Sequence, residues 1–230
     1  MKNNSLLIPL SVGFALSMGV ASAASMDPVS DSEISRAKSM AMANTTTAPR
    51  LAARRAAVAV DQTTTQTNPT VEFLRVQPHR FSKSELSANK RWADTTAYDY
   101  NTDELITTVI DLDNNQIIAT ERTKNMQPPM AENEIKRAIE IVFQDDEERR
   151  ILDAEFTRIT GGTLTSIDQL QYKAFTFFAD SMPNTVNSAS SACGAQRCAQ
   201  LLLYTADNIV FEVSPIVNLS AGLVTQRMGY

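Results

Sequence analysis

The amino-acid sequence predicts an α+β fold made of two tandem units, each with a helix packed on an antiparallel sheet. Two observations lead to this prediction. The middle of the chain has apolar residues at helical spacing, whereas the segments on both sides are rich in β-branched residues and turn signals. The order strand, polar turn, strand and closing strand also occurs twice, which indicates two copies of one arrangement within residues 71–230.

The N-terminus resembles an export signal. Lys2 is followed by an apolar stretch at residues 6–20, and the small residues after it fit the A-x-A pattern for signal peptidase. We therefore expect residues 1–24 to be a signal peptide, cleaved after Ala23 or Ala24. The mature chain is then expected to be periplasmic or extracellular, without a membrane anchor. The alternative is a retained signal anchor.

Residues 25–70 have the composition of a flexible linker. Ala and Thr dominate the segment, and Phe73 is the first aromatic residue after it. Such a sequence buries too little apolar surface to offset the entropy that is lost on ordering. We expect a tether here, with a short helix at residues 51–60 and its most flexible part at residues 61–70.

The first unit, residues 71–127, is expected to consist mainly of strands. Strand-rich sequence occurs at residues 71–76, 95–101, 105–111 and 117–121. The polar run Asp113-Asn114-Asn115 predicts a turn between the last two strands. Ser82 and Glu85 have the spacing of a capping box, which predicts a short helix after the first strand.

The second unit, residues 128–230, is expected to begin with two helices. The apolar positions 135, 138, 139, 142 and 143 form one face of the first helix. The acidic run at residues 145–148 suits the first turn of the second helix, and we interpret it as a solvated helix start rather than a metal site. Gly161-Gly162 should end that helix. Further strands are expected at residues 170–179, 201–204, 209–213, 216–219 and 223–226.

Charge composition excludes some partners. The sequence has 21 Lys and Arg against 26 Asp and Glu, and loss of Lys2 with the signal leaves 20 − 26 = −6. Binding to nucleic acid or to an acidic membrane surface requires clustered positive charge. We therefore expect neither kind of partner.

Cys193 and Cys198 are the two cysteines of the chain. In an exported protein they are expected to form a disulfide. Five residues apart on a helix they would be out of reach, so the prediction places them on a loop or at the mouth of a hairpin. A redox-active thiol pair and a thiolate metal site remain as alternatives.

Several stretches carry a family resemblance. They are the hairpin at residues 106–122 with its Ile110-Asp111-Leu112 step, Gln127-Pro128-Pro129 with the helix opening at residues 132–135, Leu202-Leu203-Tyr204, and residues 214–219. Their types and order resemble the two N-terminal, non-catalytic, cystatin-like domains of copper amine oxidases. The resemblance covers about 150 residues and implies a helix packed on an antiparallel sheet in each unit.

The same resemblance implies that catalysis lies elsewhere. In that family a large β-sandwich, which would follow Tyr230, holds copper through three His side chains beside a tyrosine-derived quinone. This chain has one His, His79. Tyr98-Asp99-Tyr100 is similar to the family's cofactor sequence only superficially, because Ala97 stands where Asn is expected. One imidazole cannot build a copper site. We expect no catalytic, cofactor-binding or metal-ligating residue here, and no cofactor.

Other candidate residues have structural interpretations. His79 lies in a Pro-containing stretch that predicts a surface loop, and no nucleophile motif accompanies it. Four scattered methionines could in principle bind Cu(I), but their spacing favours a role in side-chain packing: Met40, Met42, Met126 and Met130. The expected function is a non-catalytic exported module that binds a protein partner, with an oxidase catalytic chain as one such partner. The alternatives are copper-dependent oxidation of primary amines and a cystatin-like peptidase inhibitor.

Overall fold

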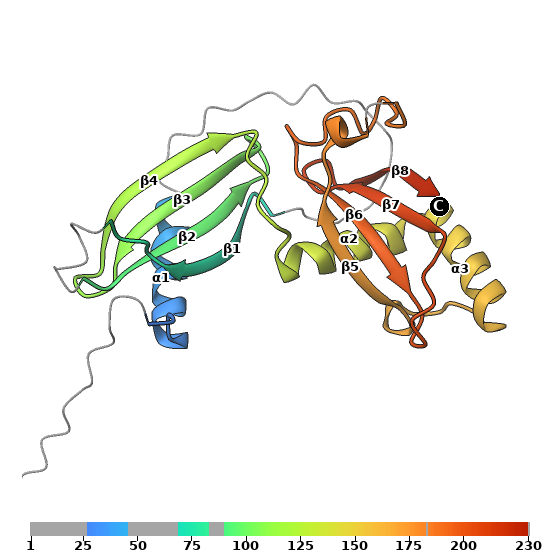
Figure 1. The fold of residues 1–230 in the computed structure, drawn as a ribbon, viewed down its shortest axis with the longest axis horizontal. Coiled ribbons are helices and arrows are strands. Elements are labelled where there is room, and N and C mark those ends of the chain that lie inside the picture. The colour runs from blue at the N-terminus through green and yellow to red at the C-terminus, as the bar shows by residue number, and fades with distance from the viewer. Residues whose placement is uncertain (1–26, 46–68, 83–89, 183, 230) are drawn as a thin grey trace, which may run out of the picture.

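The computed structural model describes residues 27–45, 69–82, 90–182 and 184–229. These residues form three α-helices and two four-stranded antiparallel sheets, which confirms the predicted α+β class (Figure 1). The proposed signal peptide, the helix expected at residues 51–60 and most of the helix expected after Ser82 lie outside the described residues. No helix in the described ranges combines the length and apolar character needed to cross a membrane.

The first sheet, sheet A, is a simple meander. Its strands are β1 (Val71–Pro78), β2 (Trp92–Asp99), β3 (Glu104–Asp111) and β4 (Gln116–Lys124), paired in that order. β2 and β3 pair without interruption, whereas a register shift interrupts each of the other two pairs. All four strands predicted for the first unit are present. The turn predicted between β3 and β4 is present too, with Asn115 in the left-handed region at φ 53°.

The helix of the first unit lies inside the segment that the sequence predicted as a linker. α1 (Asp31–Thr45) packs against β1, β2 and β3, and its Ala37 and Ala41 are buried. The interpretation of residues 25–70 as a tether is therefore wrong for α1, and the first unit begins before residue 71. Composition missed this helix because its buried face is made of alanines instead of large apolar side chains.

The second sheet, sheet B, follows two helices. α2 (Glu132–Gln144) and α3 (Asp146–Thr160) confirm the helices predicted at the start of the second unit. Asp145 caps α3 by accepting the Glu147 and Glu148 N–H groups, so the acidic run forms a helix start. Gly161, at φ 73°, ends the helix as predicted.

Sheet B is also a meander of four strands. They are β5 (Gln171–Thr176), β6 (Cys198–Tyr204), β7 (Val213–Asn218) and β8 (Leu223–Gly229). Two short 3₁₀ helices flank β5: η2 (Ile167–Gln169) and η3 (Ala179–Ser181). The strand predicted at residues 209–213 is wrong. Ile209 and Val210 are exposed, Tyr204 and Val210 form only an isolated bridge, and β7 starts at Val213.

Each sheet has a helix on one face, but the two cores differ in size. α2 packs against all four strands of sheet B, and Figure 1 shows α1 and α2 each lying behind its sheet. The core beneath α1 is small, and three of its five buried residues are alanines: Ala37, Ala41, Ala93, Ile110 and Leu112. The larger core beneath α2 extends to Tyr98, Tyr100 and Leu105 of the first unit, so apolar packing joins the two units.

A buried arginine fastens each helix to its sheet. In the first unit, Arg91 donates from Nε and Nη2 to the two carboxylate oxygens of Glu33, at 2.9 and 2.8 Å. Its Nη1 and Nη2 also donate to the backbone carbonyls of Asp27 and Pro28, at 2.7 and 2.8 Å. The Glu33 carboxylate accepts the Ser30 N–H at the start of α1. Arg91 thus holds the helix through its first turn.

The second unit repeats this clamp. Arg197 donates from Nε and Nη2 to Glu134, at 2.7 and 2.8 Å, and to the carbonyls of Pro128 and Pro129. The Glu134 carboxylate accepts the Ala131 N–H at the start of α2. Arg197 and Glu134 are both fully buried. A buried ion pair of this kind is satisfied because every charged group has several hydrogen-bond partners.

The backbone hydrogen bond and the strand irregularity beside each arginine also occur in both units. The Leu112 N–H donates to the Arg91 carbonyl and the Leu219 N–H donates to the Arg197 carbonyl, each at 2.8 Å. A register shift occurs two residues before each of these leucines, between β3 and β4 and between β7 and β8. The two units therefore share topology, clamp and irregularity.

Candidate protein-interaction surface

The face of sheet B that points away from α2 is only partly covered. Alternate residues of β5 and β6 point to this face, because their neighbours pack into the core beneath α2. One half of the face is covered by the segment between β5 and β6, where Phe177 and Cys193 pack on Cys198 and Ile216. The other half has no such cover among the described residues.

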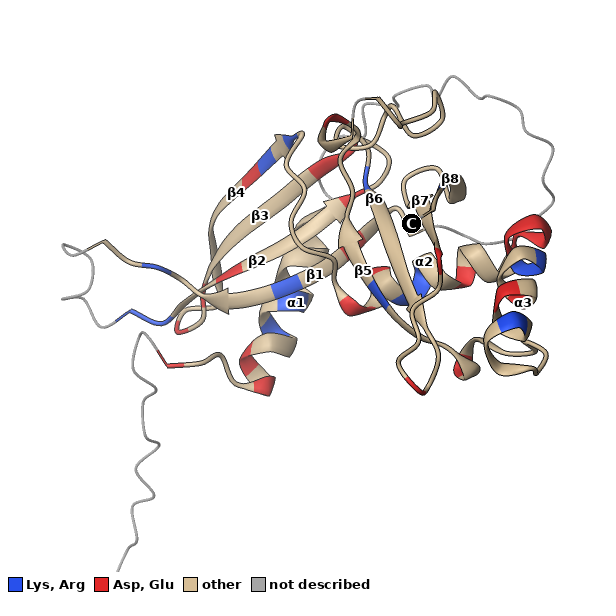
Figure 2. Ribbon diagram, turned by 45° about the vertical axis from the view of Figure 1, so that its right-hand side comes forward, with Lys and Arg blue, Asp and Glu red and all other residues tan. Residues whose placement is uncertain are grey.

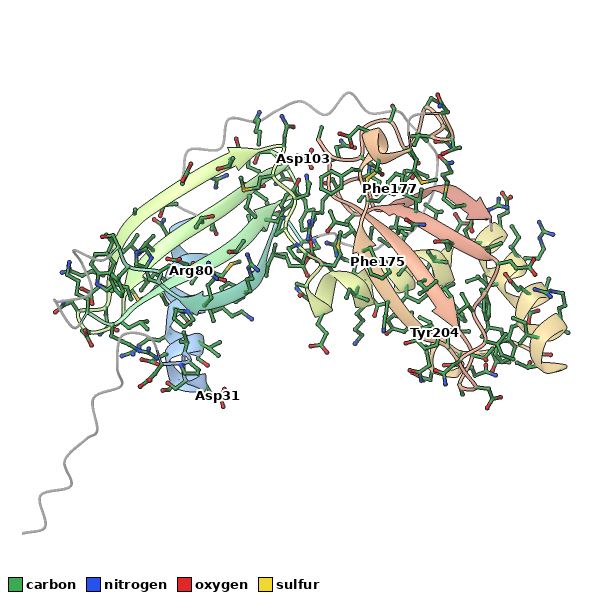
Figure 3. All side chains as sticks on the ribbon, viewed as in Figure 1. Asp31, Arg80, Asp103, Phe175, Phe177 and Tyr204 are labelled. Atoms are coloured by element: carbon green, nitrogen blue, oxygen red, sulfur yellow. A yellow bond between two sulfur atoms is a disulfide. The ribbon has the colours of Figure 1, made fainter. Side chains whose placement is uncertain are left out.

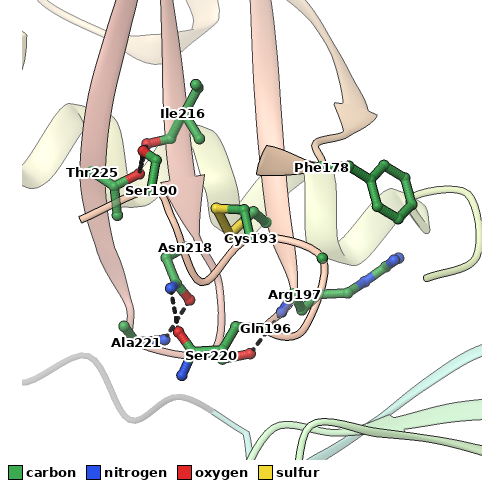
Figure 4. The surroundings of a disulfide bond; sticks show 12 residues. Phe178, Ser190, Cys193, Gln196, Arg197, Ile216, Asn218, Ser220, Ala221 and Thr225 are labelled. Carbon is green, nitrogen blue, oxygen red and sulfur yellow. Dashed lines mark hydrogen bonds between the residues drawn. A yellow bond between two sulfur atoms is a disulfide. The ribbon is translucent and has the colours of Figure 1, made fainter. Parts of the chain in front are cut away.

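A disulfide closes the covering segment. Cys193 and Cys198 are bonded, with their Cα atoms 5.4 Å apart, which confirms the predicted pairing (Figure 4). Both cysteines are buried. The ring between them forms a turn with Gly194 at φ 108°, a conformation that favours glycine. The disulfide thus holds the segment where it crosses the sheet, and leaves the other half of the face open.

We call the uncovered half the open face. Phe175 is 56% exposed and Val210 is 49% exposed. Figure 3 shows Phe175 on β5 and Tyr204 on the neighbouring β6. Among the residues of the open face, which are listed next, Lys173 is the one that carries a charge. Its members are Gln171, Lys173, Phe175, Gln200, Leu202, Tyr204 and Val210.

The open face differs in charge from the helices of its unit. Figure 2 shows acidic and basic residues concentrated on α3, whereas β6 carries none. A monomeric soluble protein exposes scattered apolar residues, but an apolar patch with one cation resembles the centre of a protein interface. This surface can bury an apolar segment of a partner and can pair Lys173 with a carboxylate.

The tyrosines that resembled a cofactor sequence lie between the two units. Tyr98 belongs to β2 and Tyr100 follows it, and both side chains are buried. The Tyr100 hydroxyl lies 2.7 Å from a Glu72 oxygen and 2.8 Å from a Glu134 oxygen. Burial raises the pKa of Tyr98 to about 12 and raises that of Tyr100 further. Both therefore stay protonated, as packed hydrogen-bonding residues of the junction.

Side chains from both units complete this junction. Arg137 of α2 donates to Glu72 of β1 at 2.8 Å. Gln127 donates from its amide to the Tyr98 hydroxyl and to the Gly194 carbonyl of the disulfide ring. These hydrogen bonds link the two units through buried side chains.

His79 lies in the irregular segment directly after β1 and is half-buried. Its Nδ1 is 2.5 Å from an Asp94 oxygen, and its ring contacts those of Phe81 and Trp92. The described side chains that contact the His79 ring belong to Asp94, Phe81 and Trp92, none of which is a hydroxyl or thiol nucleophile. In the described part of the chain, no three His, Cys, Asp or Glu side chains group closely enough to hold a metal ion.

A shallow groove lies on the other side of sheet B. It has a volume of about 380 Å³ and runs between α2 and the segment that leads into β5. Ile139 and Phe143 of α2, with Tyr172, supply its apolar lining, and Lys136 and Glu140 supply charges of opposite sign. Among the described residues, those with a buried, unpartnered polar side-chain atom do not belong to its lining.

No protein-family model matches the sequence, and no curated protein matches it either. Among solved structures, a copper-containing benzylamine oxidase from Hansenula polymorpha is similar, with a TM-score of 0.48 and 12% sequence identity. The match covers 90% of this chain and 30% of that one, so this chain spans less than a third of the oxidase. Nothing about function follows from a likeness at this level.

Proposed function

We propose that this protein is an exported, non-catalytic module of two cystatin-like units that binds a partner protein through the open face of sheet B. The observation that supports it most is the open face itself, where Phe175, Leu202 and Tyr204 surround a single cation, Lys173. Residues of this kind carry much of the binding energy when they are buried at the centre of an interface.

Export is supported by the sequence and by the cysteines. The N-terminal 24 residues have the pattern of a secretory signal. The buried Cys193–Cys198 disulfide suits an oxidising compartment, because cytosolic thiols are kept reduced. We therefore propose a periplasmic or extracellular location for the mature chain.

The partner's chemistry follows from the surface. A segment with apolar side chains can cover Phe175 and Leu202, and an Asp or Glu within it can pair with Lys173. The resemblance to N-terminal oxidase domains makes an oxidase catalytic chain the first partner to test. Catalysis would then belong to the partner, and this chain would act as its accessory.

Site-specific crosslinking tests the proposal. A photoreactive amino acid placed at position 173 of the mature protein is exposed to the exported proteins of the native host, and crosslinked products are identified by mass spectrometry. We expect one predominant partner, lost when Phe175→Asp is added. The matched control carries the photoreactive residue at exposed Glu121 of β4. Equal crosslinking from both positions, or none from 173, contradicts the proposal.

Direct assays separate the two alternative functions. The purified chain is incubated with copper, dialysed, and assayed for peroxide release on a primary amine; it is also tested for inhibition of a peptidase panel. We expect neither activity. Amine-dependent peroxide above a blank supports oxidation, and stoichiometric inhibition of a peptidase supports an inhibitor.

A further inference from the structure

β5 is an edge strand of sheet B and has one free backbone side. Among the described strands it pairs with β6 alone, and this pairing has no register shift (Figure 1). The Phe177 N–H continues the pairing by donating to the Cys198 carbonyl at 3.0 Å. Because the hydrogen-bonding direction alternates along an antiparallel strand, every second residue before Phe177 also bonds toward β6. The N–H and C=O groups of Tyr172 and Ala174 therefore point outward, and within the described ranges they have no hydrogen-bond partner.

The other three edge strands each have a feature that hinders the addition of a strand. A register shift interrupts β1, which ends at Pro78, a residue without an N–H. β4 has charged residues at three of its last four positions, and its pairing with β3 is also interrupted. On β8, the Asn187 side chain donates to the Thr225 carbonyl at 2.8 Å. Features of this kind protect sheet edges from pairing with other chains, so β5 is the edge best suited to accept a strand.

A strand beside β5 has a binding surface on each of its two faces. Lys173 and Phe175 flank it on the open face, where Phe175 is 56% exposed. On the opposite face, Tyr172 lines the groove of about 380 Å³ between α2 and the segment that leads into β5. Ile139 and Phe143 complete the apolar wall of this groove. Because side chains alternate across a strand, one extended segment can fill the groove and cover the open face together.

We propose that the partner protein donates an extended strand that pairs antiparallel with β5 and continues sheet B. This inference rests on the proposed function, since it specifies how the partner occupies the open face. The outward backbone groups of Tyr172 and Ala174 supply affinity, and side-chain positions supply specificity. The partner places an apolar residue opposite Phe175, an acidic residue opposite Lys173 and an apolar residue opposite Tyr172. In its own chain order, the partner segment reads apolar, any residue, acidic, apolar.

A peptide of this pattern tests the proposal. Ser-Thr-Ile-Thr-Glu-Ile-Thr-Ser, with fluorescein at its N-terminus, is titrated into the purified protein, and polarisation is measured. Ala174→Pro removes one outward N–H and keeps the bonds to β6, whereas the matched control Ala174→Val adds similar bulk and keeps the N–H. We expect saturable binding that is at least about tenfold weaker for Ala174→Pro than for Ala174→Val. Absence of binding to the unchanged protein, or equal binding by the two variants, overturns the proposal.

A charge exchange keeps the proposal testable if Ala174→Pro fails to fold. Lys173→Glu changes an exposed side chain and places two acidic groups opposite each other. We expect it to weaken binding of the peptide by about fivefold or more, and a peptide with Lys in place of its Glu should restore binding. Lys124→Glu, at an exposed position of β4, is the matched control and should leave binding unchanged. Failure of the exchanged peptide to restore binding counts against the assigned register and overturns the proposal.

Hydrogen exchange separates failure of this inference from failure of the proposed function. The partner identified by crosslinking at position 173 should slow exchange of the outward Tyr172 and Ala174 amides, because strand pairing protects them from solvent. A partner that crosslinks at position 173 but leaves these amides unprotected overturns strand addition, and the proposed function stands. The absence of any crosslinked partner removes the proposed function, and this inference with it.

Discussion

Arg91 and Arg197 make matching contacts with the helices that cover their sheets. Each guanidinium donates to both oxygens of a glutamate in the first turn of a helix and to two consecutive backbone carbonyls before that helix. The carbonyls belong to Asp27 and Pro28 in one unit and to Pro128 and Pro129 in the other. The same set of contacts thus occurs in both units.

Removal of Arg197 should destabilise the protein strongly. Arg197→Ala leaves the Glu134 carboxylate buried without its main partner, and breaking a buried pair in this way costs roughly 3–5 kcal/mol. Urea unfolding of the mature protein measures the loss. Glu212→Ala is the matched control, because Glu212 and its partner Arg158 are both largely exposed, and it should change stability by less than about 1 kcal/mol. Similar losses for both variants would contradict the assigned role.

The disulfide should contribute modestly to stability. Reduction, or the double substitution Cys193→Ser/Cys198→Ser, should lower the free energy of unfolding by about 2 kcal/mol, because the closed loop is short. Intact mass without reductant should be about two hydrogens below that of the reduced chain. Two alkylatable thiols in native material would refute the pairing. Gln127→Ala controls for the ring's contact with the junction, since it removes the bond to the Gly194 carbonyl and keeps the disulfide.

Acid should release α1 before it unfolds sheet B. Hydrogen bonds from Arg91 lower the pKa of Glu33 from 4.5 to about 2. A carboxylate with a lowered pKa stabilises the fold above its ordinary pKa, and that contribution is lost as pH falls toward the folded-state value. We expect α1 amides to lose protection from hydrogen exchange between pH 4.5 and about 2. Glu33→Gln removes the titrating group, so its α1 protection should not vary in this way. Constant protection of wild-type α1 would contradict the prediction.

The chain should not retain copper stoichiometrically. His79 is its one histidine, and Nδ1 of that ring already lies 2.5 Å from Asp94. A copper site built on imidazole needs several such ligands. Metal analysis after incubation with Cu²⁺ and dialysis should find well below one copper per chain, and His79→Ala should not change the result. One copper per chain, lost in His79→Ala, would show that the prediction is wrong.

The sequence predicts those parts of the fold whose signals are local. α2 has a continuous apolar stripe, and β1 to β4 have β-branched runs separated by turn residues. α1 lacks such a signal, because its partner Arg91 lies 58 residues away from Glu33. Local composition cannot show a helix that depends on so distant a contact. The spacing Pro-x4-Glu-x3-Ala, which α1 and α2 share, was the available clue.

The candidate surface was less accessible to sequence reasoning. Phe175 and Leu202 read as ordinary strand residues, and only the path of the disulfide-closed segment decides which half of sheet B is covered. The strand wrongly predicted at residues 209–213 also shows that composition alone does not reveal how a segment is paired. Ile209 and Val210 have strand composition, but they are exposed beside Tyr204 and are not paired into a strand.

The position of Trp92 gives the first unit its own optical signal. Trp92 is the one tryptophan of the chain, it follows Arg91 directly, and the Lys90 Nζ lies 4.5 Å from the centre of its ring. Tryptophan fluorescence of the unlabelled protein therefore arises in sheet A alone and does not report on sheet B. A spectrum that shifts while far-ultraviolet circular dichroism is retained would mark the loosening of one unit within an otherwise intact molecule.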